Sequence, residues 1–506
     1  MPDRIVPVPP ERIAVIDIGS NSLRLVVFER LGATLLPALN EKVMCGLGRG
    51  IARTGRLNRD GVELAYFNVQ RFVALARALK ADHLAAIATA AVREASDGAA
   101  FAGEIERQCG VPVRIVDGPE EARLSAAGVL AGIPGADGVV ADLGGGSVEL
   151  VRIRGGAEGS SIGEGISLPL GPLRLAEVAD DPARLARTIE ETVADAALLR
   201  AAAGKTLFLV GGAWRAIARL HMEQTRYPLH IIHQYTVARR AAEEFLEVLA
   251  PMSRRSLERI ATINRKRLEL VPVAAMILNR LLAVGAPTRI MFSAYGLREG
   301  YAYGLLPPDP TVDPLIAACI GVAISQSRGR SDGDRLARWI APVFPELSPR
   351  LRRLHHAACW LSDIAWTEHP DYRAEQAFTR SLRMPIGAID HRERVFIASA
   401  LHARYGGAPD DPIKTATRPL IGDEDAAEAR ALGLALRLSY TLCGGAFNLL
   451  DDVVLRRDGE ALALELPASG SLYQGEAVER RLAALGRALG LVPQTVQRRA
   501  RRPALA

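Results

Sequence analysis

Residues 13–28 read Ile13-Ala-Val-Ile-Asp17-Ile-Gly19-Ser20-Asn21-Ser22-Leu-Arg-Leu-Val-Val-Phe28, an apolar run, a small polar turn with an acid, and a second apolar run. A near-copy follows as Gly138-Val-Val-Ala-Asp142-Leu-Gly144-Gly145-Gly146-Ser147-Val-Glu149-Leu-Val151. Both copies fit the pattern Asp-apolar-Gly-x-x-Ser-x-x-Leu-Val. Because the acid, glycine and serine repeat in register, the sequence predicts an internally duplicated fold with two β-hairpins. Their glycine-rich turns are expected to present backbone N–H groups to an anion.

Length, charge and cysteine content set the wider frame. The 506 residues predict two to four domains, and the net charge of +6 favours a polyanionic partner. An arginine-rich composition with no bearing on partners is the open alternative. Aromatic residues make up only 5%, which disfavours nucleic-acid stacking platforms. The five cysteines are far apart, so neither a disulfide framework nor a structural zinc site is indicated.

No stretch predicts export or membrane insertion. The N-terminal residues lack the apolar core of a signal peptide, and no apolar run approaches the length of a membrane span. The sequence therefore predicts a cytoplasmic protein. The arginine-rich end of the chain is interpreted as a solvated tail, with partner binding as the alternative.

Between the two copies, strands and helices are expected to alternate. Asn58 can cap a helix whose apolar residues recur every three or four positions, and residues 83–89 read as a buried strand. A strand at 111–116 runs into a helix for which Gly118 is the expected N-cap and Pro119 the first helical residue. This alternation is typical of α/β layers.

Four segments follow from these patterns. Residues 1–127 and 128–306 are expected to form two α/β lobes, and the proline-rich residues 307–314 a linker. Residues 315–506 are rich in Ala, Leu and Arg and predict a helical domain, with a strand at 461–466 and a final helix near 476–490.

Six motifs in order make the chain resemble the exopolyphosphatase and guanosine pentaphosphate phosphohydrolase (Ppx/GppA) family, which is related to sugar kinases, actin and the 70-kilodalton chaperones. Besides the two turns, they are Thr89-Ala-Ala-Val-Arg93, Glu120-Glu121-Ala-Arg123-Leu, Gly211-Gly212-Ala-Trp214-Arg215 and Ser293-Ala-Tyr-Gly296-Leu-Arg298-Glu299-Gly300. The resemblance implies two ribonuclease-H-like lobes of the actin-like ATPase type with a cleft between them. An all-α, HD-like C-terminal domain is implied to follow.

The glycine turns are interpreted as holders of a phosphate chain, since glycine lets donors approach closely and Ser hydroxyls add further donors. Two ordinary hairpin turns are the alternative reading of either turn alone. The phosphate-binding residues are predicted to be Gly19, Ser20, Asn21, Ser22, Gly144, Gly145, Gly146 and Ser147, with Arg267 in a basic track for distal phosphates. That track lies in a charge run that could equally be a solvated face.

Acids among phosphates would repel them unless a cation intervenes. The resemblance points to Asp142 and Glu149 as ligands of Mg²⁺, another divalent ion or K⁺, with Asp17 close by. A solvent-facing Glu149 is the competing interpretation.

Glu121 is the candidate base that activates water, favoured over Glu120 by the resemblance. Glutamates in a first helical turn also stabilise the helix, so both roles stay open for the pair. Arg93 is placed to pair with the terminal phosphoryl oxygens, unless it forms a surface salt bridge. A metal site in the helical domain is doubtful, because Ser362 stands before Asp363 where a histidine would be needed.

The predicted function is an Mg²⁺-dependent exopolyphosphatase that releases orthophosphate from the ends of inorganic polyphosphate. Cleavage of guanosine pentaphosphate by the same chemistry is the nearest alternative, followed by a kinase of the superfamily and a phosphate-chain sensor without turnover. The resemblance and the long helical domain favour a homodimer. Nucleic-acid binding rests on basicity alone.

Overall fold

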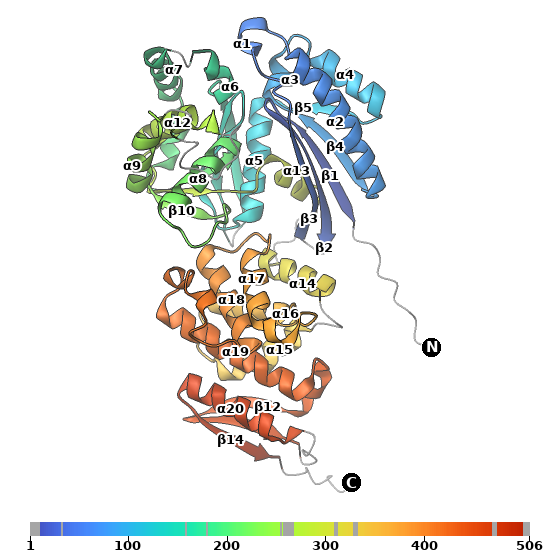
Figure 1. The fold of residues 1–506 in the computed structure, drawn as a ribbon, viewed down its shortest axis with the longest axis vertical. Coiled ribbons are helices and arrows are strands. Elements are labelled where there is room, and N and C mark those ends of the chain that lie inside the picture. Colours follow the sequence, from blue (N-terminus) through green and yellow to red (C-terminus); the bar gives the residue numbers. More distant parts are fainter. Residues whose placement is uncertain are drawn as a thin grey trace. The chain divides into compact units, whose positions relative to one another are not determined.

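The computed structural model of the chain describes residues 11–31, 34–156, 159–178, 181–252, 256, 268–307, 312–326, 332–467 and 473–498. The chain divides into two compact units, which are Met1–Pro314 with Ile386–Ala388, and Leu315–Pro385 with Ile389–Ala506 (Figure 1). The first unit is built on two sheets, and the second is largely helical. Two α/β lobes followed by a helical region confirm the predicted fold class.

The first sheet has five strands in the order β3-β2-β1-β4-β5. Buried side chains of β1, β2 and β4 form one core with α2, in which Ala65, Val69, Phe72 and Ala76 are buried. Asn58 caps α2 as predicted, since its side chain accepts the Gly61 N–H. The elements of this lobe are β1 (Arg12–Ile18), β2 (Ser22–Leu31), β3 (Thr34–Met44), α1 (Ile51–Thr54), α2 (Arg59–Ala78), β4 (His83–Ala88), α3 (Ala90–Glu94), α4 (Gly98–Cys109) and β5 (Val113–Ile115).

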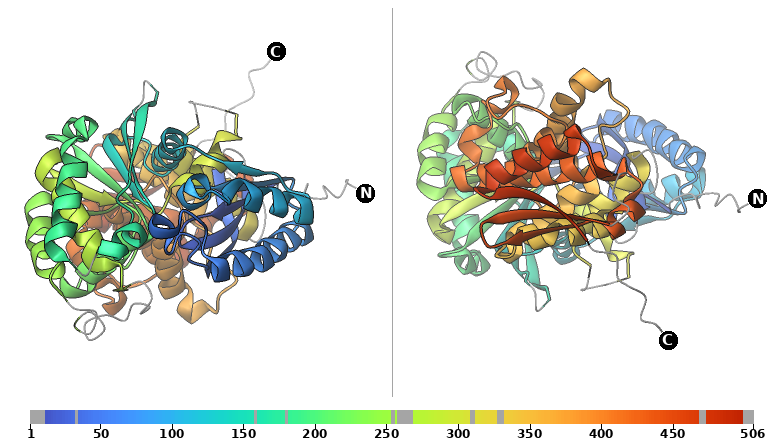
Figure 2. Two further views of the ribbon diagram at one scale, coloured as in Figure 1. Left: turned by 90° about the horizontal axis from the view of Figure 1, so that it is seen from above. Right: turned by 90° about the horizontal axis from the view of Figure 1, so that it is seen from below.

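The second sheet has six strands in the order β10-β11-β9-β6-β7-β8. Its outer core is formed with α7, α8, α9 and α12, the green helices seen from above in Figure 2. The elements are β6 (Asp137–Leu143), β7 (Val148–Arg154), β8 (Ser161–Leu168), α6 (Pro172–Leu175), α7 (Pro182–Ala194), β9 (Thr206–Gly211), α8 (Gly212–Gln224), β10 (Tyr235–Ala238), α9 (Arg239–Leu249), α12 (Val271–Gly285) and β11 (Arg289–Phe292).

The two sheets repeat one arrangement. In each, an antiparallel hairpin (β1–β2 and β6–β7) is extended by a third antiparallel strand, and its first strand pairs in parallel with β4 or β9. The cross-strand partner of Asp17 is Arg24, and the partner of Asp142 is Glu149. The internal duplication predicted from the two copies is therefore present in the topology.

Two helices cross between the lobes, α5 (Gly118–Gly132) and α13 (Leu297–Gly304). Although α5 follows the first sheet, its Ala122, Ala126 and Val129 pack on the second, while Leu297 and Ala302 of α13 pack on the first. Glycines allow close contact: a Cβ on Gly300 would lie 1.9 Å from the Leu124 carbonyl oxygen, and one on Gly128 2.1 Å from that of Gly296. This crossing fixes α5 against α13.

The start of α5 differs from the prediction by one residue. Asp117, not Gly118, is the N-cap, and its carboxylate accepts the Glu120 N–H at 2.8 Å. The reason is that a glycine has no side chain with which to accept a free N–H of the first turn. Glu120 and Glu121 lie in that first turn, as predicted.

The predicted segment boundaries stay predictions. The division between residues 127 and 128 falls inside α5, and the linker at 307–314 ends where α14 begins. Residues 308–311 lie outside the described residues.

The second unit consists of helices and one small sheet. Its helices are α14 (Pro314–Gln326), α15 (Gly333–Ile340), α16 (Pro349–Leu361), α17 (Arg373–Arg383), α18 (His391–Arg404), α19 (Asp423–Cys443) and α20 (Glu476–Leu489). The predicted strand is β13 (Ala461–Leu466), and it pairs with two strands that were not predicted, β12 (Val454–Asp458) and β14 (Val492–Gln497). These three strands are red in the right view of Figure 2.

An arginine lies beside the Ser362-Asp363 doublet, where the sequence left a metal site in doubt. Asp363 is buried with its Oδ1 atom 3.7 Å from Nη2 of Arg404. The Arg404 guanidinium lies 4.3 Å from the ring centre of Tyr405 and 3.8 Å from that of Tyr440. The buried Arg404 guanidinium therefore lies beside the carboxylate of the Ser362-Asp363 doublet.

Among the described residues, no helix is both long and apolar enough to span a membrane.

Candidate active site

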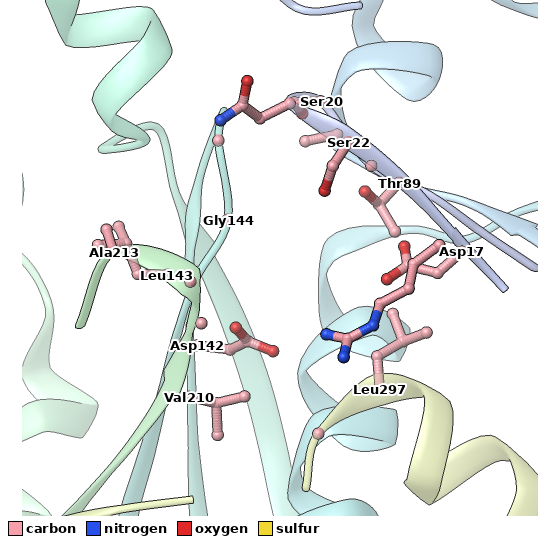
Figure 3. Close-up of a pocket in the computed structure, with 18 of the residues that line it drawn as sticks. Asp17, Ser20, Ser22, Thr89, Asp142, Leu143, Gly144, Val210, Ala213 and Leu297 are labelled. Carbon is pink, nitrogen blue, oxygen red and sulfur yellow. The ribbon is translucent and has the colours of Figure 1, made fainter. Parts of the chain in front are cut away.

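A cavity of about 170 Å³ lies in the first unit, between the two glycine-rich turns (Figure 3). Figure 3 shows Asp17 of β1 and Asp142 of β6 directed toward the same space. Most of the predicted site residues line it: Asp17, Gly19, Ser20, Asn21, Ser22, Glu121, Asp142, Gly144, Gly145 and Ser147. Arg93, Gly146 and Glu149 are not part of its lining but lie behind it, as described below.

The two turns have the same construction. The Gly19 N–H donates to the Ser22 carbonyl at 3.1 Å, and the Gly144 N–H donates to the Ser147 carbonyl at 3.0 Å. These bonds close each turn. No backbone carbonyl of the described residues accepts from the N–H groups of Ser20, Asn21, Gly145 or Gly146. Such free donors suit an anion.

Ser20 fixes the first turn to the start of α3. Its hydroxyl oxygen is buried and accepts the Ala91 N–H at 3.2 Å. Because Ser20 is the acceptor in this bond, its hydroxyl proton and its backbone N–H are still the donors that its predicted role needs.

Four carboxyl groups lie at or next to the cavity, those of Asp17, Glu121, Asp142 and Glu149. Asp17 accepts a hydrogen bond from Nη1 of Arg298 at 2.7 Å, and Asp142 accepts one from the Ser125 hydroxyl. Burial raises the pKa of Asp142, with the nearby Asp17 charge adding to the effect. Glu149, opposite Asp142 in the hairpin, is 1% exposed, which rules out a solvent-facing side chain.

One oxygen of Glu149 has no hydrogen-bond donor. Its Oε1 atom accepts from the Ser167 hydroxyl at 2.9 Å, while Oε2 is buried and unpaired within the described part of the chain. The Ser147 hydroxyl, which also has no hydrogen-bond partner within the described residues, lies close enough to lower the Glu149 pKa. Burial nevertheless raises this pKa well above the usual range, assisted by the charges of Glu121 and Asp142.

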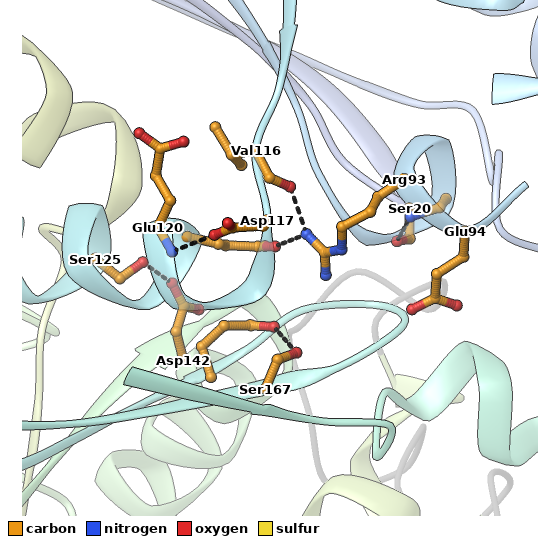
Figure 4. A network of polar contacts seen from close by, with 12 residues as sticks. Ser20, Arg93, Glu94, Val116, Asp117, Glu120, Ser125, Asp142 and Ser167 are labelled. Carbon is orange, nitrogen blue, oxygen red and sulfur yellow. Dashed lines mark hydrogen bonds and ion pairs between the residues drawn. The ribbon is translucent and has the colours of Figure 1, made fainter. Parts of the chain in front are cut away.

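Glu121 and Arg93 form a buried pair, and Figure 4 labels Arg93 and marks its hydrogen bonds with dashed lines. Arg93 Nη1 donates to Glu121 Oε2 at 2.9 Å and to the Val116 carbonyl at 2.8 Å. The Arg93 side chain is 21% exposed and the Glu121 side chain 9% exposed, so Arg93 is not in a surface salt bridge. Burial raises the pKa of Glu121 to about 7, against the lowering effect of Arg93. Carboxyl groups with such a pKa serve as general bases near neutral pH.

The neighbouring Glu120 has a different environment. Its carboxylate lies on the outer face of α5, where it pairs with Arg114 and, at 3.7 Å, with Arg123. Arg123 therefore contacts Glu120, whereas the arginine that contacts Glu121 is Arg93.

The carboxyl cluster fits a divalent cation on charge and on free ligands. The pKa values of Glu121, Asp142 and Glu149 are raised by burial and by neighbouring carboxylate charges, and Glu149 Oε2 is buried with no hydrogen bond within the described residues. In the described part of the chain, no group of three or more His, Cys, Asp or Glu side chains that could hold a metal ion is found. Mg²⁺ is commonly held by one or two carboxylates together with water and substrate phosphates, and the cluster offers such carboxylates.

Basic residues that were not assigned roles from the sequence also line the cavity. They are Arg24, Lys42, Arg215 and Arg298. Burial, with the charges of Arg298 and Arg215, lowers the pKa of Arg24 to about 10. Three of them stand within or beside the quoted motifs, and the hairpin pairing of Arg24 with Asp17 is a signal that could have revealed it. Lys42 has no such signal.

Two further residues named from the sequence are Arg267 and Trp214. Arg267 falls outside the described residues, so its predicted role stays a prediction. Trp214, beside the double glycine of α8, is fully buried, and its Nε1 donates to the Ala274 carbonyl at 3.2 Å. It is therefore part of the core and does not face the cavity.

Comparison with known proteins gives two family matches and a shared fold. Residues 25–308 match the Ppx/GppA phosphatase family, and residues 315–494 match the C-terminal domain described for exopolyphosphatases. A structure described as an exopolyphosphatase from Cytophaga hutchinsonii is 24% identical, with a TM-score of 0.52 over 58% of this chain and 97% of that one. A Ppx/GppA family member from Aquifex aeolicus is 24% identical, with a TM-score of 0.50 over the same shares.

Proposed function

The chain belongs to the Ppx/GppA phosphatase family and is a phosphoanhydride hydrolase, and from this premise we propose that it removes terminal phosphoryl groups from inorganic polyphosphate. The observation that carries the proposal is the buried Glu121, whose pKa is raised to about 7 and which lines a cavity between two anion-binding turns. A binding protein without turnover needs no such base.

In the proposed reaction, the turns and the basic residues Arg24, Lys42, Arg215 and Arg298 hold the end of the chain. A water oxygen attacks the terminal phosphorus, and Glu121 takes a proton from that water. The bridging P–O bond then breaks, which releases orthophosphate and leaves a chain shorter by one unit. Positioning and charge stabilisation supply most of the catalysis in phosphoryl transfer.

Asp142 and Glu149, with Asp17 nearby, are proposed to hold Mg²⁺. When bound, the ion would neutralise phosphate charge and polarise the phosphoryl oxygens. Ser125 and Ser167 donate to Asp142 and Glu149 and so orient their carboxyl groups. Asp17 is tied to Arg298, so its proposed place is beside the ion and not as its main ligand.

The cavity favours a substrate without a base. Among the described residues that line it, none is Phe, Tyr, Trp or His, so a guanine would find no aromatic stacking partner. Its volume of about 170 Å³ is also below the roughly 300–1,000 Å³ of pockets for drug-sized ligands. A short run of phosphoryl units is the better fit.

The predicted homodimer and cytoplasmic location stay predictions.

The test is phosphate release from long-chain polyphosphate with Mg²⁺, measured in parallel with guanosine pentaphosphate. We expect kcat/KM to be at least tenfold higher for polyphosphate. A preference for the nucleotide would support the alternative substrate, and a requirement for an acceptor molecule would support the kinase.

Arg93 is proposed to act as a positioning residue for Glu121. Since Arg93 lowers the Glu121 pKa, Arg93→Gln is expected to raise it further, and the base then stays protonated to higher pH. The acid limb of the pH profile of kcat/KM should move upward, with about a tenfold loss below the limb for each pH unit of movement. Arg93→Lys should move the acid limb less, because lysine keeps the positive charge and lacks only the planar, two-pronged guanidinium. A uniform loss at all pH values would instead favour direct contact with phosphate.

A further inference from the structure

The tips of the two phosphate turns touch each other where α3 and α6 lie. A Cβ on Gly145 would lie 3.0 Å from the Ser20 Cβ, and one on Gly146 would lie 3.2 Å from the Ala90 Cβ. There is barely room for a methyl group between the turns, so a phosphate group cannot pass there. On this side, the cavity ends at a wall.

Arg174 of α6 ties this wall together. Its Nε donates to the Gly146 carbonyl at 3.0 Å, and its Nη2 pairs with the carboxylate of Glu94 on α3. The Leu173 N–H donates to the Gly145 carbonyl at 3.0 Å. One arginine thus binds the second turn to the helix on which the first turn rests.

The pair lies behind the cavity and not in it. Ala90 and Pro172, on the same two helices, line the cavity, whereas Glu94 and Arg174 do not. Figure 4 shows Glu94 beside Arg93, with the two side chains diverging. Glu94 and Arg174 therefore have no place in the reaction described above.

The basic residues line the cavity from other elements. Arg24 comes from β2, Lys42 from β3 and Arg215 from α8, and none comes from α3 or α6. Phosphates behind the terminal one would find their cationic partners among these residues. A chain that enters past them reaches the wall with its end.

We propose that Glu94 and Arg174 determine specificity for chain ends by holding this wall closed. The inference rests on the proposed function. Attack on an internal phosphorus would break one bridging P–O bond and leave two shorter chains, and it requires that the chain leave the site in two directions. The closed wall removes the exit past α3 and α6, so a chain that ends against it presents its terminal phosphorus to the water held by Glu121.

The test uses long polyphosphate chains whose two ends are blocked as phosphoramidates, with unblocked chains in parallel, and gel electrophoresis of the products. Glu94→Arg places two guanidinium groups against each other and should part the wall. We expect wild type to leave blocked chains intact and Glu94→Arg to cut them into shorter fragments at least tenfold faster. The reversed pair, Glu94→Arg with Arg174→Glu, should return to the wild-type result.

Arg71→Glu is the matched control, because it creates the same kind of repulsion with Glu41 at a pair that does not line the cavity. It should behave as wild type. If Glu94→Arg does not fold, Glu94→Gln removes the pair without repulsion and should show the same change more weakly. Intact blocked chains with a folded variant that still degrades unblocked chains would overturn the inference. Failure of wild type on unblocked chains would instead overturn the proposed function.

Discussion

Replacing Glu121 with glutamine is expected to lower the rate of phosphate release by about 10²–10⁴-fold, the usual contribution of a positioned general base. Glutamine has the same shape, and its carbonyl oxygen can still accept the hydrogen bond from Arg93 Nη1. It cannot take a proton from water. The loss should therefore fall on kcat.

Substrate binding should survive this change. One negative charge fewer would face the phosphates, so the affinity for tripolyphosphate should be equal or higher, as calorimetry can measure. Because burial already disfavours the charged form of Glu121, the variant should also be at least as stable as wild type.

Glu120→Gln is the matched control from the same helical turn. Glu120 pairs with surface arginines and does not line the cavity, so its loss should change kcat by no more than a few-fold. Turnover close to wild type in Glu121→Gln would remove Glu121 as the base, and an equal loss in both variants would point to damage to α5.

The repeated turn could be predicted because its signal is local. Glycine, serine and an acid at fixed spacing recur in two copies, and each copy forms its hairpin from neighbouring residues. The cap of α5 is almost as local, and the one-residue error arose from choosing a glycine over the adjacent Asp117, whose carboxylate does the capping. Local chemistry decides such features before any packing does.

Residues whose partners come from distant parts of the chain could be located but not given a role. Arg93 follows its strand as expected, but its partner Glu121 is brought to it by α5. Arg24, Arg215 and Arg298 stand in the quoted motifs, but only the crossing of α5 with α13 and the pairing of the strands bring them to one cavity. Their convergence is a tertiary property.

The strand β14 left no pattern to find. All six of its residues are exposed, and Pro493 cannot donate to a neighbouring strand. Without alternation between buried and exposed residues, an edge strand resembles a loop in sequence. The adjacent β13 was found because four of its six residues are buried and apolar.

Glu149→Gln is expected to reduce activity by at least about 100-fold while stabilising the protein in the absence of divalent cations. The carboxylate lies opposite Asp142, is almost fully buried and has an oxygen without a donor. Removing its charge removes the repulsion that protonation or a bound cation would otherwise relieve.

The pH dependence of this stabilisation has a definite sign. The pKa of Glu149 is raised in the folded protein, so the folded state holds the proton more tightly than the unfolded chain does. The favourable effect of the protonated group is complete below the pKa of the unfolded chain, near 4.3, and is lost as pH rises through the folded pKa. The melting temperature of Glu149→Gln should therefore equal that of wild type at low pH. At neutral pH it should be higher, by roughly 2–4 °C for each kcal/mol gained.

Addition of Mg²⁺ separates this interpretation from simple repacking. In wild type the ion should raise the melting temperature, because it binds only the folded state, and in Glu149→Gln the shift should be much smaller. Ser167→Ala is the graded control, since it removes the donor to Oε1 and leaves the charge in place, so the Mg²⁺-dependent shift should persist. An undiminished Mg²⁺ shift in Glu149→Gln, or a lower melting temperature without the ion, would show that this carboxylate does not hold the cation, and Asp142 would then have to do so without it.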